Sequence, residues 1–281
     1  MRSGNPTLNA FEKPMTWDEL GDAPAGASSE SVARAKSGTM TVAGTATALG
    51  VMLGLCAAAA VGSWTFFEPW LAAGTPGKIM PWLLGGGLGA FVIALVVTFK
   101  PKTAPVLGPV YAILEGVFLS AASLFVVARF LPAPEDGTAI GSEGTGLIFQ
   151  AVLGTFGIAG GLLAGYASGL IRVGSTMKKV MVVMLGGVMI YAVGLFLLNG
   201  LFGMGIPNLW ASASPLGIGF SALLVVLASL MLVWDFEVVD QGVKNAAPKY
   251  MEWYGGFAIL VTLAWMYLEL LRLLAKLRSN D

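Results

Sequence analysis

Three carboxylates interrupt otherwise apolar stretches of the sequence, and they are the residues best placed to do chemistry. Glu115 lies in YAILEG, Asp235 in LVWDF and Glu269 in YLELLR. A charged side chain at the centre of a membrane helix costs ~2.5–3.5 kcal/mol to insert, and such residues usually mark ion or proton pathways. The three carboxylates therefore predict a pathway for ions or protons through an apolar bundle.

Each carboxylate also has a structural explanation. Glu269 precedes Arg272 by three residues, which allows an i,i+3 ion pair near the membrane interface. Asp235 follows an apolar stretch and fits a solvated helix end. Glu115 lies six positions after Pro109, ~9 Å inside the boundary at about 1.5 Å per residue. Because a glutamate is too short to reach back to the interface, we expect Glu115 in a polar or water-lined environment.

The sequence excludes several kinds of catalytic site. It contains no His, which removes Ser-His-Asp and Cys-His catalysis and His-ligated zinc or haem. Its single Cys, Cys56, lies in an apolar run, where we expect it to pack as a small hydrophobic side chain. The glycines at 85–87 resemble a phosphate loop only superficially, because no strand precedes them. We predict neither an enzyme nor a bound cofactor.

The composition defines the elements that must position these residues. Of 281 residues, 56% are hydrophobic and 11% are charged, whereas soluble domains are about 45–50% apolar and about 25% charged. Seven apolar stretches approach the ~20 residues that cross a ~30 Å hydrocarbon core. They are 40–65, 80–99, 109–131, 146–171, 180–198, 215–234 and 254–274. We predict an all-α integral membrane protein with seven transmembrane helices.

Polar and charged residues predict the domain organisation and the orientation. Residues 1–37 are polar and rich in Gly, Ser, Pro and Ala, which predicts a flexible tail before a transmembrane domain at 38–281. Eleven Lys and Arg residues fall on the side of this tail and two on the other, so the positive-inside rule places the N-terminus in the cytoplasm. Only Arg272, Lys276 and Arg278 violate the bias, and the last helix either tolerates this or does not cross fully. The 16 basic and 16 acidic residues cancel, so no nucleic-acid partner is expected.

Four glycines at four-residue spacing suggest a helix-packing face. Gly157, Gly161, Gly165 and Gly169 would lie on one side of a helix and let a neighbour approach closely. We expect them to pack inside the bundle, and the alternative is an interface between two copies of the chain.

Several short segments, in this order on seven helices, together resemble the Bax inhibitor-1 family in its bacterial branch. The segments are MRSGNP at 1–6, AP at 104–105 through EG at 115–116, LS at 119–120, GMGIP at 203–207, WDF at 234–236, APKYMEWY at 247–254 and YLELLRLL at 267–274. The resemblance implies a bundle with the last helix in the centre and the other six around it. It also implies a pH-gated calcium leak and a multi-pass protein of the bacterial plasma membrane.

The resemblance further implies roles for two of the carboxylates. In that family an acidic residue of the sixth helix and one of the seventh share a proton and sense pH. Asp235 matches the sixth-helix motif, and Glu269 matches the seventh-helix position with Glu in place of Asp. Two carboxylates that share a site cannot both ionise cheaply, and their oxygens suit a hard cation. Asp235 and Glu269 are thus expected to sense pH and to bind calcium transiently, as a permeant ion.

The sequence distance between these two residues complicates their pairing. Contact across a symmetric antiparallel hairpin requires a turn near residue 252, whereas the turn signals, Gly242 and 246–248, come earlier. A turn at 246 leaves Glu269 ~18 Å deeper than Asp235. By this count the depth of Glu115 falls between them. Our hypothesis is that Glu115 is either a third member of the site or the actual partner of one of the two acids.

A second function also follows from the resemblance. Some bacterial relatives look like modulators of a membrane-bound protease that act through a cytoplasmic N-terminal tail, and residues 1–37 form such a segment here. The expected partners are therefore the lipid bilayer and calcium ions and, for this alternative, a membrane protease. A secondary transporter is less well supported, because the sequence shows no internal repeat.

Overall fold

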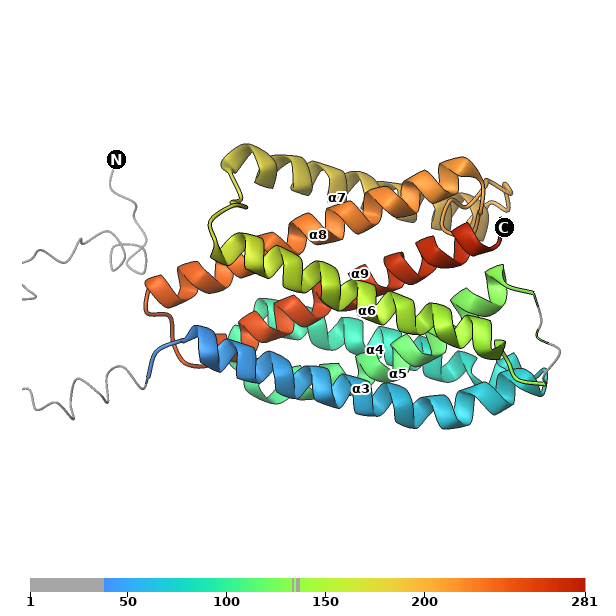
Figure 1. Ribbon diagram of the computed structural model, residues 1–281, viewed down its shortest axis with the longest axis horizontal. Coiled ribbons are helices and arrows are strands. Elements are labelled where there is room, and N and C mark those ends of the chain that lie inside the picture. The colour runs from blue at the N-terminus through green and yellow to red at the C-terminus, as the bar shows by residue number, and fades with distance from the viewer. Residues whose placement is uncertain (1–37, 133, 135–136, 281) are drawn as a thin grey trace, which may run out of the picture. The chain divides into compact units, whose positions relative to one another are not determined.

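The computed structural model describes residues 38–132, 134 and 137–280, and the whole tail predicted at 1–37 lies outside them. The unit that begins at Met40 is a bundle of long helices (Figure 1). Its long helices are α3 Val42–Ala72, α4 Met80–Phe99, α5 Ala104–Phe130, α6 Gly141–Ala167, α7 Ser175–Leu195, α8 Pro215–Lys244 and α9 Met251–Arg278. Short helical segments are η1 Pro76–Lys78, η2 Pro101–Thr103 and the π-helix η3 Phe196–Leu201.

Seven helices in the described part of the chain are long and apolar enough to cross a membrane, which confirms the predicted class and number. Most of them extend beyond the predicted apolar stretch. The largest difference is in α8, which continues ten residues past Trp234 to Lys244. These added turns are held to the bundle by buried Val239, with Phe236 and Val243 packed on the same cluster, and exposed pairs such as Lys244 with Asp240 at 2.6 Å add little.

The last helix is the central one, as predicted. α9 packs against α3, α5, α6 and α8, and most of its middle turns are buried. The expectation of six helices around it is wrong, because α4 packs mainly on α5 and α7 mainly on α8, at the outside of the bundle. An apolar helix gains nothing from burial when the solvent is lipid, so α4 and α7 can stay on the periphery.

The close packing of α3 on α5 and on α9 depends on glycines. A Cβ at Gly116 of α5 would overlap the backbone carbonyl oxygen of Cys56 in α3. A Cβ at Gly256 of α9 would reach the backbone of Leu49 at 2.9 Å. α3 therefore approaches both helices at backbone distance, as small residues permit in membrane bundles.

The glycine face predicted for internal packing is oriented differently. Gly157 and Gly161 are exposed, and a Cβ added at either position would have no neighbouring atom within 4 Å, while Gly169 follows the end of α6 with a φ of +76°. The residue that packs inward is Gly154, where a Cβ would meet the side chain of Leu270 at 2.7 Å. The prediction of internal packing is wrong for Gly157 and Gly161, whereas a Cβ at Gly165 would meet the side chain of Ile171 at 2.7 Å. Four-residue spacing defines a common face but not the direction in which that face points.

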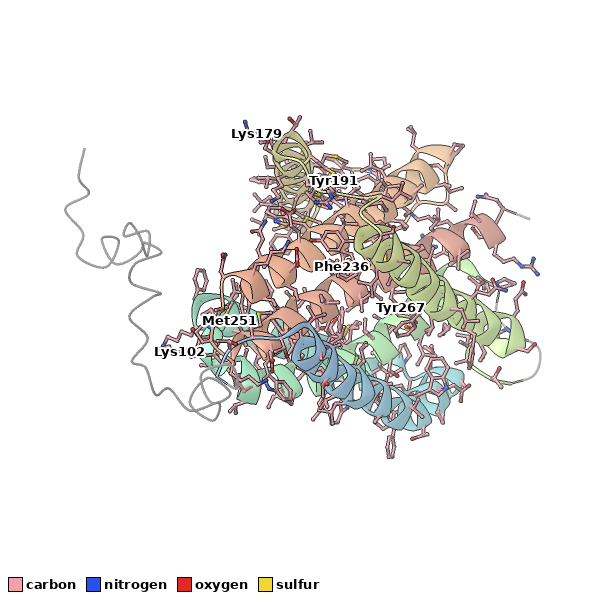
Figure 2. All side chains as sticks on the ribbon, turned by 60° about the vertical axis from the view of Figure 1, so that its left-hand side comes forward. Lys102, Lys179, Tyr191, Phe236, Met251 and Tyr267 are labelled. Carbon is pink, nitrogen blue, oxygen red and sulfur yellow. The ribbon has the colours of Figure 1, made fainter. Side chains whose placement is uncertain are left out.

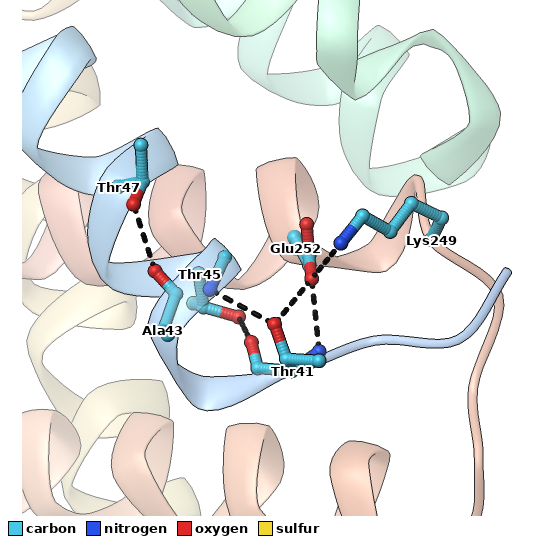
Figure 3. A network of polar contacts seen from close by, with 7 residues as sticks. Thr41, Ala43, Thr45, Thr47, Lys249 and Glu252 are labelled. Atoms are coloured by element: carbon cyan, nitrogen blue, oxygen red, sulfur yellow. Dashed lines mark hydrogen bonds and ion pairs between the residues drawn. The ribbon is translucent and has the colours of Figure 1, made fainter. Parts of the chain in front are cut away.

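The start of α3 is bonded to the turn that precedes α9 (Figure 3). The N–H of Met40 donates to the carbonyl of Ala247 at 2.7 Å. The Oε1 atom of Glu252 accepts from the Thr41 N–H at 2.9 Å, from the Thr41 hydroxyl at 2.7 Å and from Lys249 Nζ at 2.8 Å. One carboxylate oxygen thus joins the beginnings of α3 and α9.

The C-terminus of α9 lies at the opposite end of the bundle from Met40 (Figure 1). With 28 residues, α9 is about 42 Å long, which exceeds the hydrocarbon thickness. Its basic residues have protein partners: Arg272 pairs with Glu269 at 2.6 Å, and Arg278 pairs with Glu143. Lys276 donates to three neutral oxygens. We call the two ends the Met40 end and the Arg278 end.

Candidate functional site

A line of polar contacts joins α8 to α9. Thr262 donates its hydroxyl to Asp235 at 2.5 Å, and Ser229 contacts the sulfur of Met266 at 3.7 Å. Nearer the Arg278 end, Lys276 donates to Ser221 at 2.8 Å. We call the line formed by these residues together with Glu269 the α8–α9 seam.

The seam has one continuous antiparallel register. Moving fourteen residues back along α8, from Asp235 to Ser221, moves the partner fourteen residues forward along α9, from Thr262 to Lys276. Fourteen residues of helix correspond to about 21 Å, much of the hydrocarbon thickness. The polar contacts of the seam therefore extend through most of the bundle.

On α9 the polar members of the seam recur every seven residues. Thr262, Glu269 and Lys276 are 8%, 4% and 0% exposed. Seven residues are close to two helical turns, so the three side chains lie along one face. The central helix thus has one polar buried face in an otherwise apolar environment.

Asp235 lies well inside α8 and not at its end. The helix continues for nine residues to Lys244, about 14 Å, so Asp235 does not lie at a helix end, as that explanation required. The partner of Asp235 is the hydroxyl of Thr262, and Glu269 lies seven residues further along α9. The two carboxylates are separated by about 10 Å along the helix axis. The expected proton-sharing pair of Asp235 and Glu269 is therefore not formed.

Glu269 is instead bound by its own helix. Arg272 Nη1 donates to Glu269 Oε1 at 2.6 Å, the i,i+3 pair that the sequence allowed. The second oxygen, Oε2, is buried and has no hydrogen-bond partner in the structure. Glu269 is thus half-satisfied, with one oxygen available to an additional proton or ligand.

Glu115 is buried, but it is not part of the seam. It lies eleven residues after the start of α5 at Ala104, about 16 Å from that end, deeper than the count from Pro109 gave. Its polar neighbours are Tyr111, one turn earlier on α5, and Cys56 of α3. α5 and α8 pack against α9 from different sides (Figure 1). The hypothesis that Glu115 is a third member of the site is therefore wrong for this arrangement.

Charged side chains surround a cavity of about 400 Å³ at the Met40 end. On α8, Asp240 accepts from Lys244 at 2.6 Å and from the Tyr166 hydroxyl at 3.3 Å. Glu237 accepts from Lys178 at 3.0 Å, and its Oε2 is buried without a partner. Glu237 and Asp240 both lie within two turns of Asp235 on α8. The cavity is therefore a polar vestibule next to the seam.

A second cavity, of about 460 Å³, is apolar and lies on the other side of α9. Residues of α3, α5, α6 and α9 line it. One of them is Tyr267 of α9, which is labelled in Figure 2. Ser123 and Tyr267 share a hydrogen bond of 2.7 Å at its wall. The apolar lining of this cavity suits lipid chains and not the passage of ions.

Figure 2 also shows Lys102 and Lys179, both exposed, extending away from the helices.

The structure limits what metal the site could hold. Within the ranges described, no group of three or more His, Cys, Asp or Glu side chains could hold a metal ion. Asp235 and Glu269, about two turns apart, cannot ligate the same ion. Joint calcium binding by this pair is thus a prediction that the geometry does not support.

Two members of the seam were missed by sequence reasoning. Thr262 carries no charge and gave no signal beside its apolar neighbours, although only it donates to Asp235 among the described residues. Lys276 lies beyond the apolar stretch 254–274 and stands out in the sequence only as an exception to the charge bias. The seven-residue spacing that joins Thr262, Glu269 and Lys276 could have identified both.

The fold and the seam define a polytopic α-helical membrane protein whose last two spans are joined by polar contacts, consistent with a channel-like role. A family model described as Bax inhibitor 1 like matches residues 18–279. The chain therefore belongs to the Bax inhibitor-1 family. No curated protein and no solved structure matches the chain significantly.

Proposed function

We propose that this protein is a pH-sensitive leak for cations, with Ca²⁺ as the permeant ion, in the bacterial plasma membrane. The observation that carries the proposal is the Asp235–Thr262 contact, in which a carboxylate at the end of the apolar part of α8 is bound by the central helix. Intramembrane carboxylates are costly and usually serve ion or proton pathways. The family membership is consistent with this role.

The proposed path begins at the vestibule of the Met40 end, which the Lys and Arg distribution assigns to the cytoplasm. Glu237 and Asp240 line this vestibule, each paired with a lysine, and Asp235 is the first carboxylate inside the seam. An ionised Asp235 attracts a cation, and a protonated one does not. The pH response in this proposal comes from Asp235 and its bond to Thr262 rather than from a pair of carboxylates.

The test is calcium flux into liposomes that contain the full chain and a trapped indicator, measured from acidic to neutral pH. Asp235→Asn mimics the protonated side chain and should give a low flux that no longer responds to pH. Thr262→Val removes the donor and should shift the pH at which flux changes. Glu143→Gln, at the exposed Arg278 end, is the control and should behave as wild type. An Asp235→Asn variant with the wild-type pH profile would refute the proposal.

We propose as a second role the modulation of a membrane protease through residues 1–37. The support for it is the pair of hydrogen bonds that join the residues just after that segment to the bundle. Met40 is bonded to the turn before α9 and Thr41 to Glu252 in the first turn of α9, so a force on the preceding residues would reach the central helix. Deleting residues 2–36 separates the two proposals. Calcium flux should survive this deletion, whereas co-purification of a membrane protease should be lost.

A further inference from the structure

Lys276 is a fully buried lysine near the C-terminal end of the central helix. Its side chain is 0% exposed, although lysines near the ends of membrane helices normally extend to the interface. Side chains on a helix lean toward its N-terminus, which directs this one back into the bundle. The position of Lys276 therefore requires an interior partner.

The partner is a set of three oxygens. Lys276 Nζ donates to the carbonyl of Leu209 at 2.7 Å, to the carbonyl of Gly217 at 2.9 Å and to the Ser221 hydroxyl at 2.8 Å. A lysine ammonium has three N–H donors, so each is used once. None of the three acceptors carries a charge. We call them the oxygen cage.

The cage is held in place from several directions. Leu209 belongs to the connection between α7 and α8, and its N–H donates to the Tyr191 hydroxyl at 3.0 Å. Asn280 donates to the carbonyl of Ala213 in the same connection at 2.9 Å. Three aromatic rings of α7, of this connection and of α8 pack against one another with centroids 5.1–5.4 Å apart: Tyr191, Trp210 and Phe220. Carbonyl and hydroxyl oxygens fixed in this way resemble the ligands that replace water around a cation.

The electrostatic surroundings of Lys276 are also defined. Arg272 lies one turn earlier on α9 and Glu269 two turns earlier, and these two form an ion pair with each other. The ammonium is therefore not neutralised by a carboxylate of its own, and the cage alone compensates for its lost hydration. Such a site would bind a small cation with N–H donors even without the lysine stem.

We propose that the oxygen cage is a monovalent-cation site that the ammonium of Lys276 permanently occupies, and that this tethered cation closes the Arg278 end of the α8–α9 seam. The first part is independent of the leak. The second part rests on the proposed function, because closing the seam has a consequence only if cations pass along it.

The first experiment uses the full chain in detergent and needs no ion flux. Lys276→Ala empties the cage and should lower the thermal unfolding midpoint, and added methylammonium should restore at least half of this loss. Tetramethylammonium has the same charge without N–H donors and should not restore it. Lys276→Met fills the space with an apolar chain, and Lys249→Ala removes an exposed lysine. Neither should respond to methylammonium.

A Lys276→Ala protein that folds and is indifferent to methylammonium would overturn the proposal. If this variant does not fold at all, Ser221→Ala takes its place, since it removes one acceptor and keeps the lysine. It should speed amide hydrogen exchange in residues 206–214. Unchanged exchange there would equally overturn the cage.

The second experiment measures calcium flux in liposomes. Lys276→Met should increase the flux severalfold over wild type, because the fixed positive charge is gone. Unchanged flux in a protein whose wild type conducts would refute the closing role. If wild type does not conduct, the proposed function fails, while methylammonium rescue of Lys276→Ala still decides whether the cage binds cations.

Discussion

Replacing Glu252 by alanine should loosen the start of α3 from the central helix. Its Oε1 atom receives three donors, two from Thr41 and one from Lys249 (Figure 3). The carboxylate is nearly buried, with 6% of the side chain exposed, whereas the Lys249 side chain is 54% exposed. The substitution therefore removes one shared acceptor from two half-buried hydrogen bonds of Thr41 and from an exposed ion pair.

The magnitude follows from these different environments. A donor left without a partner costs about 1–3 kcal/mol when buried. Thr41 is only half-buried, so water can reach its two donors and about 1 kcal/mol for each is appropriate. The exposed ion pair adds less than about 1 kcal/mol. Glu252→Ala should thus lower the free energy of unfolding by about 2–3 kcal/mol, and Lys249→Met by at most about 1 kcal/mol.

Denaturant titration in mixed micelles measures the loss, and hydrogen exchange of the amides of Thr41 to Thr45 locates it. Gly44→Ala provides an independent variant, since its Cβ would overlap the Glu252 carboxylate and displace it. Gly44→Ala should therefore lose similar stability and show similarly faster exchange. The reasoning is refuted if Glu252→Ala is no more destabilising than Lys249→Met and leaves exchange at the start of α3 unchanged.

Further substitutions test three other parts of the structure. Arg272→Met should lower the free energy of unfolding by about 3–5 kcal/mol, because it leaves the buried carboxylate of Glu269 without a compensating charge. The double variant with Glu269→Leu should recover most of this free energy in the same denaturant titration. Gly116→Ala should destabilise by about 1–3 kcal/mol, since its Cβ would overlap a backbone carbonyl of α3. Gly161→Ala, in open surroundings, should stay within about 0.5 kcal/mol of wild type, and equal unfolding midpoints for these two variants would contradict the packing. Asn199→Ala removes both hydrogen bonds to the backbone of residue 206 and should make the connection between α7 and α8 more susceptible to proteolysis; unchanged cleavage would argue against those bonds.

The number of spans could be predicted from the sequence, but most of their ends could not. The bounds of α4 agree at both ends, since a proline and a lysine flank its apolar run. α8 does not end with its apolar run, because hydrophobicity marks the thickness of the hydrocarbon and not the end of helical hydrogen bonding. Charged turns beyond Trp234 remain helical where their side chains pair with each other and with α7.

The partner of Asp235 could not be predicted because it depends on where one turn lies. Gly242, taken as a turn signal, lies inside α8, and the chain reverses between Asn245 and Tyr250. A turn a few residues earlier or later would bring a different face of α9 to Asp235. A glycine pattern has a similar limit, as Gly157 shows, because spacing does not say whether a face points to protein or lipid.

The partnered basic residues of α9 bear on how the chain is inserted into a membrane. Seven crossings leave the two ends of the helical part on opposite sides, so one set of Lys and Arg residues must be translocated during biogenesis. The acceptors for Arg278 and Lys276 come from α6, from α8 and from the connection before α8, which are synthesised earlier. A chain from which α6 and α8 are deleted would present the same charges of α9 to the insertion machinery without these partners. The topology of the last span is then a product of tertiary folding, and an isolated α9 would be free to insert in the opposite direction.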